Sequence, residues 1–234
     1  ASTGSIDAIY SFSSAVNVTA NNNIIRNLST PATGTITGIN EFGSSGLKTF
    51  QNNQIYNFTT TAGGAGGGTF RGISESTGTT NTYSGNIIYS LNSTGTTGGT
   101  GGTIVGITFS SGTTNNLTNN AIYDLSSTST NPAVTGINIG GGTTNNINNN
   151  LIGDLRATAS TGNVTISGIL SASGTTNNIF HNTVNIASTT TSATTFGTSA
   201  IYFSSSTPVN NLRNNIFVNT SDPGPTGGFT AAIR

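Results

Sequence analysis

Apolar residues recur along this chain at a near-constant interval, each time in the same local setting. A small residue followed by Ile returns every 30 to 34 residues from one end of the chain to the other. The eight copies are Ala8-Ile9, Gly38-Ile39, Gly72-Ile73, Gly106-Ile107, Gly136-Ile137, Gly168-Ile169, Ala200-Ile201 and Ala232-Ile233. Such a period is typical of solenoids, propellers and other repeat architectures. The spacing predicts seven full repeats and the start of an eighth.

Further sets of equivalent positions, which we call columns, keep the same period. One column holds Asn23, Asn53, Asn86, Asn120, Asn150, Asn182 and Asn214. Two residues after each Asn comes an apolar column of Ile25, Ile55, Ile88, Ile122, Ile152, Val184 and Ile216. Two more apolar columns hold Phe50, Tyr83, Leu117, Ile147, Ile179 and Leu212, and Leu28, Phe58, Leu91, Leu125 and Leu155. Because the lengths change mainly in Gly-rich stretches such as 59–68 and 92–103, we expect variable outer loops there.

The repeat unit favours short strands over helices. Each unit offers about three strand candidates, such as TIVGITF, NNLTNNA and IYDLS between residues 103 and 126, and no apolar spacing of three and four residues over helix length. A propeller blade would need four antiparallel strands. We therefore predict an all-β fold, a right-handed parallel β-helix of about seven coils with 30 to 34 residues each. In a single domain over 1–234, coils begin near 6, 36, 70, 104, 134, 166 and 198, with a partial eighth from 229.

The Asn column fits this geometry for two reasons. Equivalent residues in a parallel β-helix stack at about 4.8 Å, so each side-chain amide can pair with the copies above and below. Asn also tolerates the left-handed backbone conformation that tight corners require. We expect a structural ladder of Asn side chains along the solenoid.

These ladder motifs, of which NNxIY is the clearest, give the chain a family resemblance. It resembles right-handed parallel β-helix repeat proteins, in particular the Asn, Thr and Gly-rich repeats of large secreted bacterial surface proteins, which are adhesin-like or form fibres. The resemblance spans the whole chain. It implies an extracellular or cell-surface location and a structural task, although the wider fold also includes polysaccharide lyases and phage tailspikes.

Charge and composition narrow the possible partners. Only 5% of the residues are charged, against about 25% in typical globular proteins, and six basic residues balance six acidic ones. Without a basic field, nucleic acid is not an expected partner. No apolar run is long enough to span a bilayer, and the absence of Cys excludes disulfides and thiolate metal sites. The neutral, Thr-rich and Asn-rich composition favours an extracellular protein.

Glu41 and Glu75 are the best candidates for catalytic chemistry. Each follows its Ile by two residues, which stacks them one coil apart in a column that later holds Phe109, Ile139 and Phe203. Two carboxyl groups this close would raise one pKa. Lys48 and Arg71 are near in sequence, but no third acid or base is expected to join the pair. We expect the register to slip locally so that both Glu side chains face solvent, and we expect no enzymatic activity.

The remaining chemical candidates are weaker. Asp124 and Asp154 share a column with Asn27, Asn57 and Ser90, but calcium sites need more carboxylates than this, so we expect a solvated edge. His181 stands in a column of polar residues that includes Asn149 and Arg213, and no triad partner is evident. The glycines of GGAGGGTF, from residue 63, lack the Lys that a phosphate loop requires, and we expect a flexible turn. No metal and no cofactor are expected.

Three functional hypotheses follow. The leading one is a non-enzymatic extracellular fibre subunit or a segment of an adhesin or surface layer. The first alternative is a β-helix that binds or cleaves polysaccharide. The second is a binder of ice or another crystalline surface through Thr residues such as Thr79-Thr80 and Thr113-Thr114, although only one Thr of each pair can lie on a given face.

The two ends of the solenoid show no cap in the sequence. The first coil begins within a few residues, at 5–9, and an eighth begins at 229–233. Open strand edges with little charge favour association. We therefore expect either head-to-tail self-association into filaments or continuation into neighbouring repeats of a larger surface protein.

Overall fold

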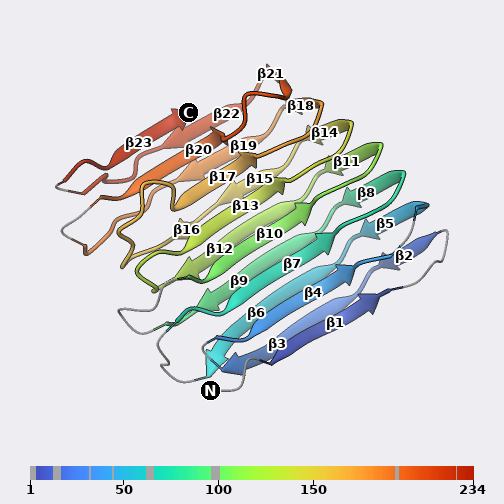
Figure 1. Ribbon diagram of the computed structural model, residues 1–234, viewed down its shortest axis with the longest axis horizontal. Coiled ribbons are helices and arrows are strands. Elements are labelled where there is room, and N and C mark those ends of the chain that lie inside the picture. Colours follow the sequence, from blue (N-terminus) through green and yellow to red (C-terminus); the bar gives the residue numbers. More distant parts are fainter. Residues whose placement is uncertain are drawn as a thin grey trace.

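Short strands and the turns between them build this protein. The computed structural model describes residues 4–12, 17–31, 33–43, 45–61, 66–95, 101–192, 195–224 and 226–234. Among these residues there is no helix, and the strands form three parallel sheets, which we name A, B and C. Figure 1 shows the strands stacked along the chain, from the first coil in blue to the last in red.

Sheet A contains the strands that carry the small residue and Ile. It consists of β1 (Ser5–Ser11), β4 (Thr35–Glu41), β7 (Thr69–Glu75), β10 (Thr103–Phe109), β13 (Ala133–Ile139), β17 (Ile166–Ser171), β20 (Gly197–Phe203) and β23 (Phe229–Ile233). These strands begin within one residue of the eight coil starts expected from the sequence. The expected period is therefore the period of the fold.

Sheets B and C complete each coil. Sheet B consists of β2 (Val18–Asn21), β5 (Leu47–Gln51), β8 (Thr80–Ser84), β11 (Thr114–Thr118), β14 (Thr144–Asn148), β18 (Thr176–Phe180) and β21 (Val209–Arg213). Sheet C consists of β3 (Ile24–Pro31), β6 (Gln54–Thr61), β9 (Ile87–Ser93), β12 (Ala121–Ser127), β15 (Leu151–Gly153), β16 (Leu155–Arg156), β19 (Thr183–Ile186) and β22 (Ile216–Asn219).

Each coil contributes to the three sheets in turn, and strands pair with their equivalents in the next coil. The central coil, for example, uses β10, β11 and β12, which are the three strand candidates expected from its sequence. Neighbouring strands are parallel in all three sheets. The predicted parallel β-solenoid of about seven turns is therefore confirmed, and the antiparallel propeller is excluded.

The apolar columns form one continuous core. Ile39, Ile73 and Ile107 are register partners in sheet A and are almost fully buried. The columns of sheets B and C, from Phe50 and Leu28 onwards, keep the predicted register as well. Stacking equivalent apolar side chains at every coil gives a long, narrow interior whose burial stabilises each coil against its neighbours.

The small residue before each Ile is required by close approach of the backbone. At Gly106, a Cβ atom would lie 2.6 Å from the carbonyl oxygen of Gly136 and 2.6 Å from Cγ2 of Ile122. Gly38, Gly72 and Gly136 have equally close neighbours in the next coil. The column is therefore small because sheet A bends here against the β-branched column of sheet C.

The predicted Asn ladder is present, with one correction at its end. The side-chain amide of Asn120 donates to Oδ1 of Asn150 at 2.9 Å, and its own Oδ1 accepts from the side chain of Asn86 at 2.9 Å. The same bonds join Asn23, Asn53, Asn86, Asn120, Asn150, Asn182 and Asn215. The assignment of Asn214 to this ladder was wrong by one residue, and so was that of Ile216, since Phe217 is the register partner of Val184.

The physical reason for this correction is the corner that precedes each ladder residue. Asn214 has a φ of 51°, in the left-handed region. The equivalent corner residues in earlier coils are also left-handed, namely Asn22, Asn52, Gly85, Asn119, Asn149 and His181. Of two consecutive Asn residues, the first therefore forms the corner and the second the ladder. Arg213, which we had placed in the corner column, instead ends strand β21.

A second ladder inside sheet B escaped the sequence analysis. Asn81, Asn115, Asn145 and Asn177 are fully buried, and each side-chain amide donates to Oδ1 of the next at 2.7 to 3.0 Å, the last bond reaching Asn210. Each amide also donates to a backbone carbonyl four residues earlier. The signal that could have found this ladder was the second Asn column, two residues before the apolar column of sheet B.

Asn120→Leu is expected to destabilise the fold strongly. The replacement deprives the buried Asn86 backbone N–H and Tyr83 carbonyl of their side-chain partner, and it removes one of two hydrogen bonds each from the Asn86 amide and from Asn150 Oδ1. At roughly 1 to 3 kcal/mol for each buried group left unpaired, a loss of at least about 3 kcal/mol is expected in chemical denaturation. Asn211→Leu, in an exposed pair with Asn178, is the matched control and should cost under about 1 kcal/mol. Equal effects of the two substitutions would contradict the ladder's role.

Candidate functional site

The two candidate carboxyl groups lie inside the solenoid. Glu41 at the end of β4 and Glu75 at the end of β7 are register partners, and they are 1% and 2% exposed. Our expectation that the register slips and turns both toward solvent was wrong. Strand alternation is the reason, because Ile39 points into the core and Glu41, two residues later, therefore points the same way. Phe109 and Ile139 occupy the same inward column in later coils.

A cation and a phenol from sheet B join the pair. Lys48 of β5 is fully buried, and its Nζ lies 2.9 Å from Oε1 of Glu41. The hydroxyl of Tyr83, on β8, donates to Oε2 of Glu75 at 3.1 Å. The expectation that no third acid or base joins the acids was therefore wrong. Lys48 could have been found from its place two residues before Phe50, since alternation turns both side chains inward.

The two carboxyl groups have different surroundings. Glu41 accepts a hydrogen bond from the backbone N–H of Gly43 at 3.0 Å and from the hydroxyl of Thr77 at 3.1 Å, in addition to its ion pair with Lys48. Burial raises the pKa of Glu75 to about 8, with the nearby charge of Glu41 adding to the rise and the Tyr83 hydrogen bond opposing it. Burial likewise raises the pKa of Tyr83 well above its usual value. At neutral pH the carboxyl group of Glu75 is thus protonated.

Arg71 does not belong to this cluster. It is the register partner of Thr37 and Val105 in sheet A, and burial lowers the pKa of its guanidinium although Asp7 opposes the shift. Asp7 also accepts a hydrogen bond from the side chain of Asn40 at 3.2 Å. The acidic cluster therefore takes its cation from sheet B.

The column of Asp124 and Asp154 is a second left-handed corner. Both residues have φ values near 50°, like Asn27, Asn57 and Ser90 in the same column. Arg156, which the sequence analysis overlooked, binds Asp154 at 2.8 Å and also bonds to Asp124. One arginine therefore pairs with both carboxylates, and the described ranges contain no group of three or more possible metal ligands.

The other weak candidates have simple structural explanations or cannot be described. His181 is exposed and left-handed, at the corner between Asn149 and Asn214. Residues 62–65 and 96–100, which include part of GGAGGGTF and fall in two of the expected variable loops, lie outside the described residues. The part of the chain that the structure describes contains no helix that could cross a membrane.

The outer surface displays rows of apolar and aromatic side chains. Tyr10, Phe12 and Phe42 are more than half exposed and stack with ring centroids 6.3 and 5.8 Å apart. A second stack, on sheet C, is formed by Tyr56, Tyr89 and Tyr123. One outward column of sheet C also exposes the apolar residues Ile24, Ile87, Leu151 and Ile216.

Threonine residues form two short rows on sheet B that overlap at a single rung. Thr80, Thr114, Thr144 and Thr176 are register partners, with Leu47 before them and Val209 after them. In the neighbouring outward column, Thr19, Thr49 and Thr82 are followed by Asn116, Asn146 and Asn178. The two Thr rows therefore share only the rung of Thr80 and Thr82, and the described part of sheet B has no extended two-Thr array of the kind a crystalline surface would match.

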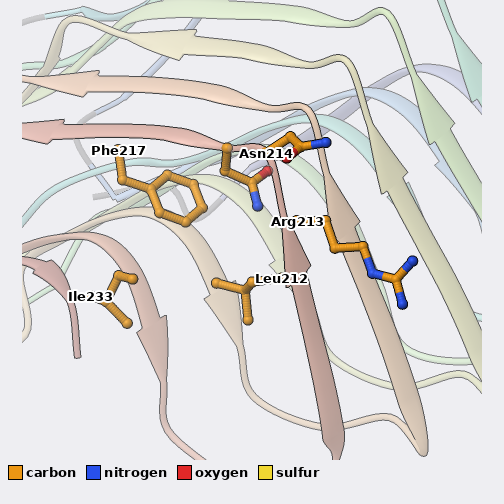
Figure 2. A pocket seen from close by; sticks show the side chains of 6 residues that line it. Leu212, Arg213, Asn214, Phe217 and Ile233 are labelled. Atoms are coloured by element: carbon orange, nitrogen blue, oxygen red, sulfur yellow. The ribbon is translucent and has the colours of Figure 1, made fainter.

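The core opens at the last coil. A hollow of about 140 Å³ is lined by Leu212, Arg213, Asn214, Asn215, Phe217 and Ile233. Figure 2 shows Leu212, Phe217 and Ile233, from three different strands, around this hollow, while the side chain of Arg213 extends away from them. These three residues are the last members of the apolar columns of sheets B, C and A, so the hollow is the end of the core itself.

Comparison with known proteins identified no relative of this chain. No family model matches the chain, and neither a curated protein nor a solved structure shows significant similarity to it. The class of protein is therefore defined by the fold alone, as a parallel β-solenoid with Asn ladders.

The buried Glu75 should make stability depend on pH. Its carboxyl group keeps a proton in the folded protein that the unfolded chain releases above a pH of about 4.5. Stability is therefore greatest below pH 4.5 and falls as the pH rises toward 8, by on the order of 4 kcal/mol if Glu75 alone is responsible. Urea denaturation at a series of pH values measures this fall, and Glu75→Gln should remove it. A fall of the same size in Glu75→Gln would contradict the assignment.

Proposed function

We propose that this protein is a non-enzymatic extracellular structural element, a β-helical rod that serves as a fibre subunit or as a segment of an adhesin or surface layer. The observation that carries the proposal is the continuity of the interior. Apolar columns and two Asn ladders run from coil to coil, so each coil is stabilised by its neighbours. In such an architecture the number of coils sets the length of the rod, which suits a spacer or fibre.

The placement of the ionisable groups supports a structural function. Glu41 and Glu75 are almost fully buried, and a polysaccharide chain cannot reach carboxyl groups that are 1% and 2% exposed. Acid–base catalysis requires the group to lie within hydrogen-bond reach of the substrate. The two carboxyl groups of this cluster instead interact with Lys48 and Tyr83 inside the core.

The surface supports contact with other molecules along the rod. One outward column on sheet C exposes apolar residues at alternate rungs, among them Ile24, Leu151 and Ile216, with Gln54, Ala121 and Thr183 between them. Rows of exposed apolar residues typically mark interaction sites. Net charge is zero, which leaves little repulsion between copies.

End-to-end stacking is the association we propose. The strands β1 and β23 are the outermost strands of sheet A, each paired on one side only, and the hollow at Leu212, Phe217 and Ile233 leaves the core open. A further coil placed there, either from a second copy or from neighbouring repeats of a larger surface protein, would extend the strand ladders and cover the apolar side chains. The first coil of a second copy offers equivalent columns, so the contact is heterologous and generates a filament.

Light scattering at increasing protein concentration tests the stacking. We expect the average mass to rise well above that of one chain, with filaments visible in electron micrographs. Ile233→Lys places a charge in the hollow and should reduce association at least tenfold, whereas Val209→Lys, at a similarly exposed position on the side of the preceding coil, should not. A stable monomer at high concentration, with both ends ordered, would contradict the proposal.

Polysaccharide binding is a second candidate function. It is favoured by the exposed stack of Tyr10, Phe12 and Phe42, because aromatic rings with free apolar surface pack against the C–H faces of sugar rings. This function is compatible with an adhesive rod, since the stack occupies a small part of the surface near the first coils.

Polysaccharides are expected to remain intact when incubated with the protein. Release of reducing or unsaturated ends measures cleavage, and calorimetric titration of the same glycans measures binding, which Phe12→Ala should weaken. Turnover that disappears in Glu75→Gln would overturn the structural function and establish an enzyme.

A further inference from the structure

Three buried polar atoms without a hydrogen bond belong to residues of two adjacent coils, the second and the third. Among the described residues, seven buried side-chain nitrogen and oxygen atoms lack a hydrogen-bond partner, and these include Lys48 Nζ, Glu75 Oε1 and Asn81 Oδ1. Lys48 Nζ has only its ion pair with Glu41. Buried polar groups are nearly always paired, so an amine, a carbonyl oxygen and a carboxyl oxygen left without a hydrogen bond in adjacent coils require an explanation.

Lys48 and Asn81 occupy adjacent rungs of one inward column. They are register partners on β5 and β8, and both are fully buried. Parallel strands lie about 4.8 Å apart, so the longer Lys side chain spans the distance to the Asn amide. In its own coil, Lys48 thus occupies the position that Asn81, Asn115 and Asn145 occupy in theirs. These Asn residues belong to the second ladder, inside sheet B, which we call the inner ladder.

The inner ladder fixes the orientation of the Asn81 side-chain amide. Its Nδ2 donates to Oδ1 of Asn115 at 2.7 Å and to the carbonyl oxygen of Thr77 at 3.1 Å. At the next rung, Oδ1 of Asn115 accepts from the coil before it, and by the same geometry Oδ1 of Asn81 faces the coil of Lys48. The carbonyl group of Asn81 is therefore presented to the side from which the Lys48 amine approaches.

The carboxyl group of Glu75 belongs to the same site. Three coils later, Ser171 and Asn177 occupy the positions equivalent to Glu75 and Asn81, and Asn177 Nδ2 donates to Ser171 Oγ at 2.8 Å. A side chain in the column of Glu75 thus reaches the inner Asn ladder. The rings of Phe50, Tyr83 and Phe109 are fully buried around the cluster and exclude water.

We propose that Lys48 and Asn81 react to form an intramolecular isopeptide bond, with Glu41 and Glu75 as the groups that move and hold the protons. The reaction joins Nζ of Lys48 to Cγ of Asn81 and releases Nδ2 as ammonia. It needs neither an oxidant nor another co-reactant. This inference does not depend on the proposed function.

The first step is a proton transfer from the Lys48 ammonium to the Glu41 carboxylate, across their 2.9 Å contact. The neutral amine then attacks Cγ of Asn81 with its lone pair, while the protonated Glu75 stabilises the developing negative charge on Oδ1 by donating a hydrogen bond. Nζ loses a second proton, which passes through Glu75 to Nδ2, and the Cγ–Nδ2 bond breaks. One ammonium, one carboxylate and one primary amide become a secondary amide, a neutral carboxyl group and ammonia, so atoms and charge balance.

The interior favours this direction of reaction. Two opposite charges held in an apolar core carry a large desolvation cost, and the reaction replaces them with neutral groups. The raised pKa of Glu75 keeps that carboxyl group protonated at neutral pH, as the second step requires. The product would join β5 to β8 covalently across one coil.

The intact mass of the folded, purified chain tests the bond directly. We expect the protein to be lighter than its sequence by one ammonia molecule, and proteolysis after unfolding to yield a branched peptide containing Lys48 and Asn81. Lys48→Arg and Asn81→Ala should restore the full sequence mass. Asn145→Ala, at an inner-ladder position that does not contact the cluster, is the matched control and should keep the ammonia loss.

Two further variants separate the roles of the groups. Asn81→Asp should reach the same product with loss of water instead of ammonia. Glu75→Gln should slow bond formation at least tenfold while Lys48 and Asn81 remain in place. An intact mass equal to that of the sequence, with Lys48 cleaved by a lysine-specific protease after unfolding, would overturn the proposal. Loss of ammonia without a branched peptide would overturn it as well, because a succinimide would then explain the mass.

Discussion

Hydrogen bonding between successive coils is the interaction on which the rest of this structure depends. A strand here has its partners only in the coils before and after it, so backbone groups are satisfied only if every coil repeats the path of its neighbour. This requirement extends to side chains, because equivalent positions face each other at one rung. Residues that bond to their own kind, such as Asn, or pack on their own kind, such as Ile, are therefore retained at equivalent positions.

The same constraint explains where the backbone adopts unusual conformations. Corner residues such as Asn119 and Asp124 have left-handed φ values at the same place in each coil, and Gly106 approaches the next coil too closely for a Cβ atom. Each of these positions is costly alone. Their cost is offset because the corner places the Asn120 side chain where it can bond to two coils at once.

The cluster of Glu41, Lys48 and Glu75 is an exception, because its residues differ chemically from those at the equivalent positions of other coils. It puts ionisable groups in columns that elsewhere hold Phe109 or Asn115. The ladder of Asn side chains begins only at Asn81, because Lys48 occupies the equivalent position in the preceding coil. A uniform rod does not require such groups, and their burial is unfavourable unless they are paired. Their concentration in adjacent coils is what suggests chemistry within the core rather than at its surface.

The sequence by itself determined the period, the parallel solenoid and the main columns, because equivalent residues in a stacked coil must be chemically alike and so leave a repeating pattern. It could not separate Asn214 from Asn215, since either residue suits a ladder and only the corner's left-handed φ distinguishes them. Nor could it place Lys48 against Glu41, which come from different sheets. Contacts across the interior depend on how three sheets face one another, and that arrangement exists only in the tertiary structure.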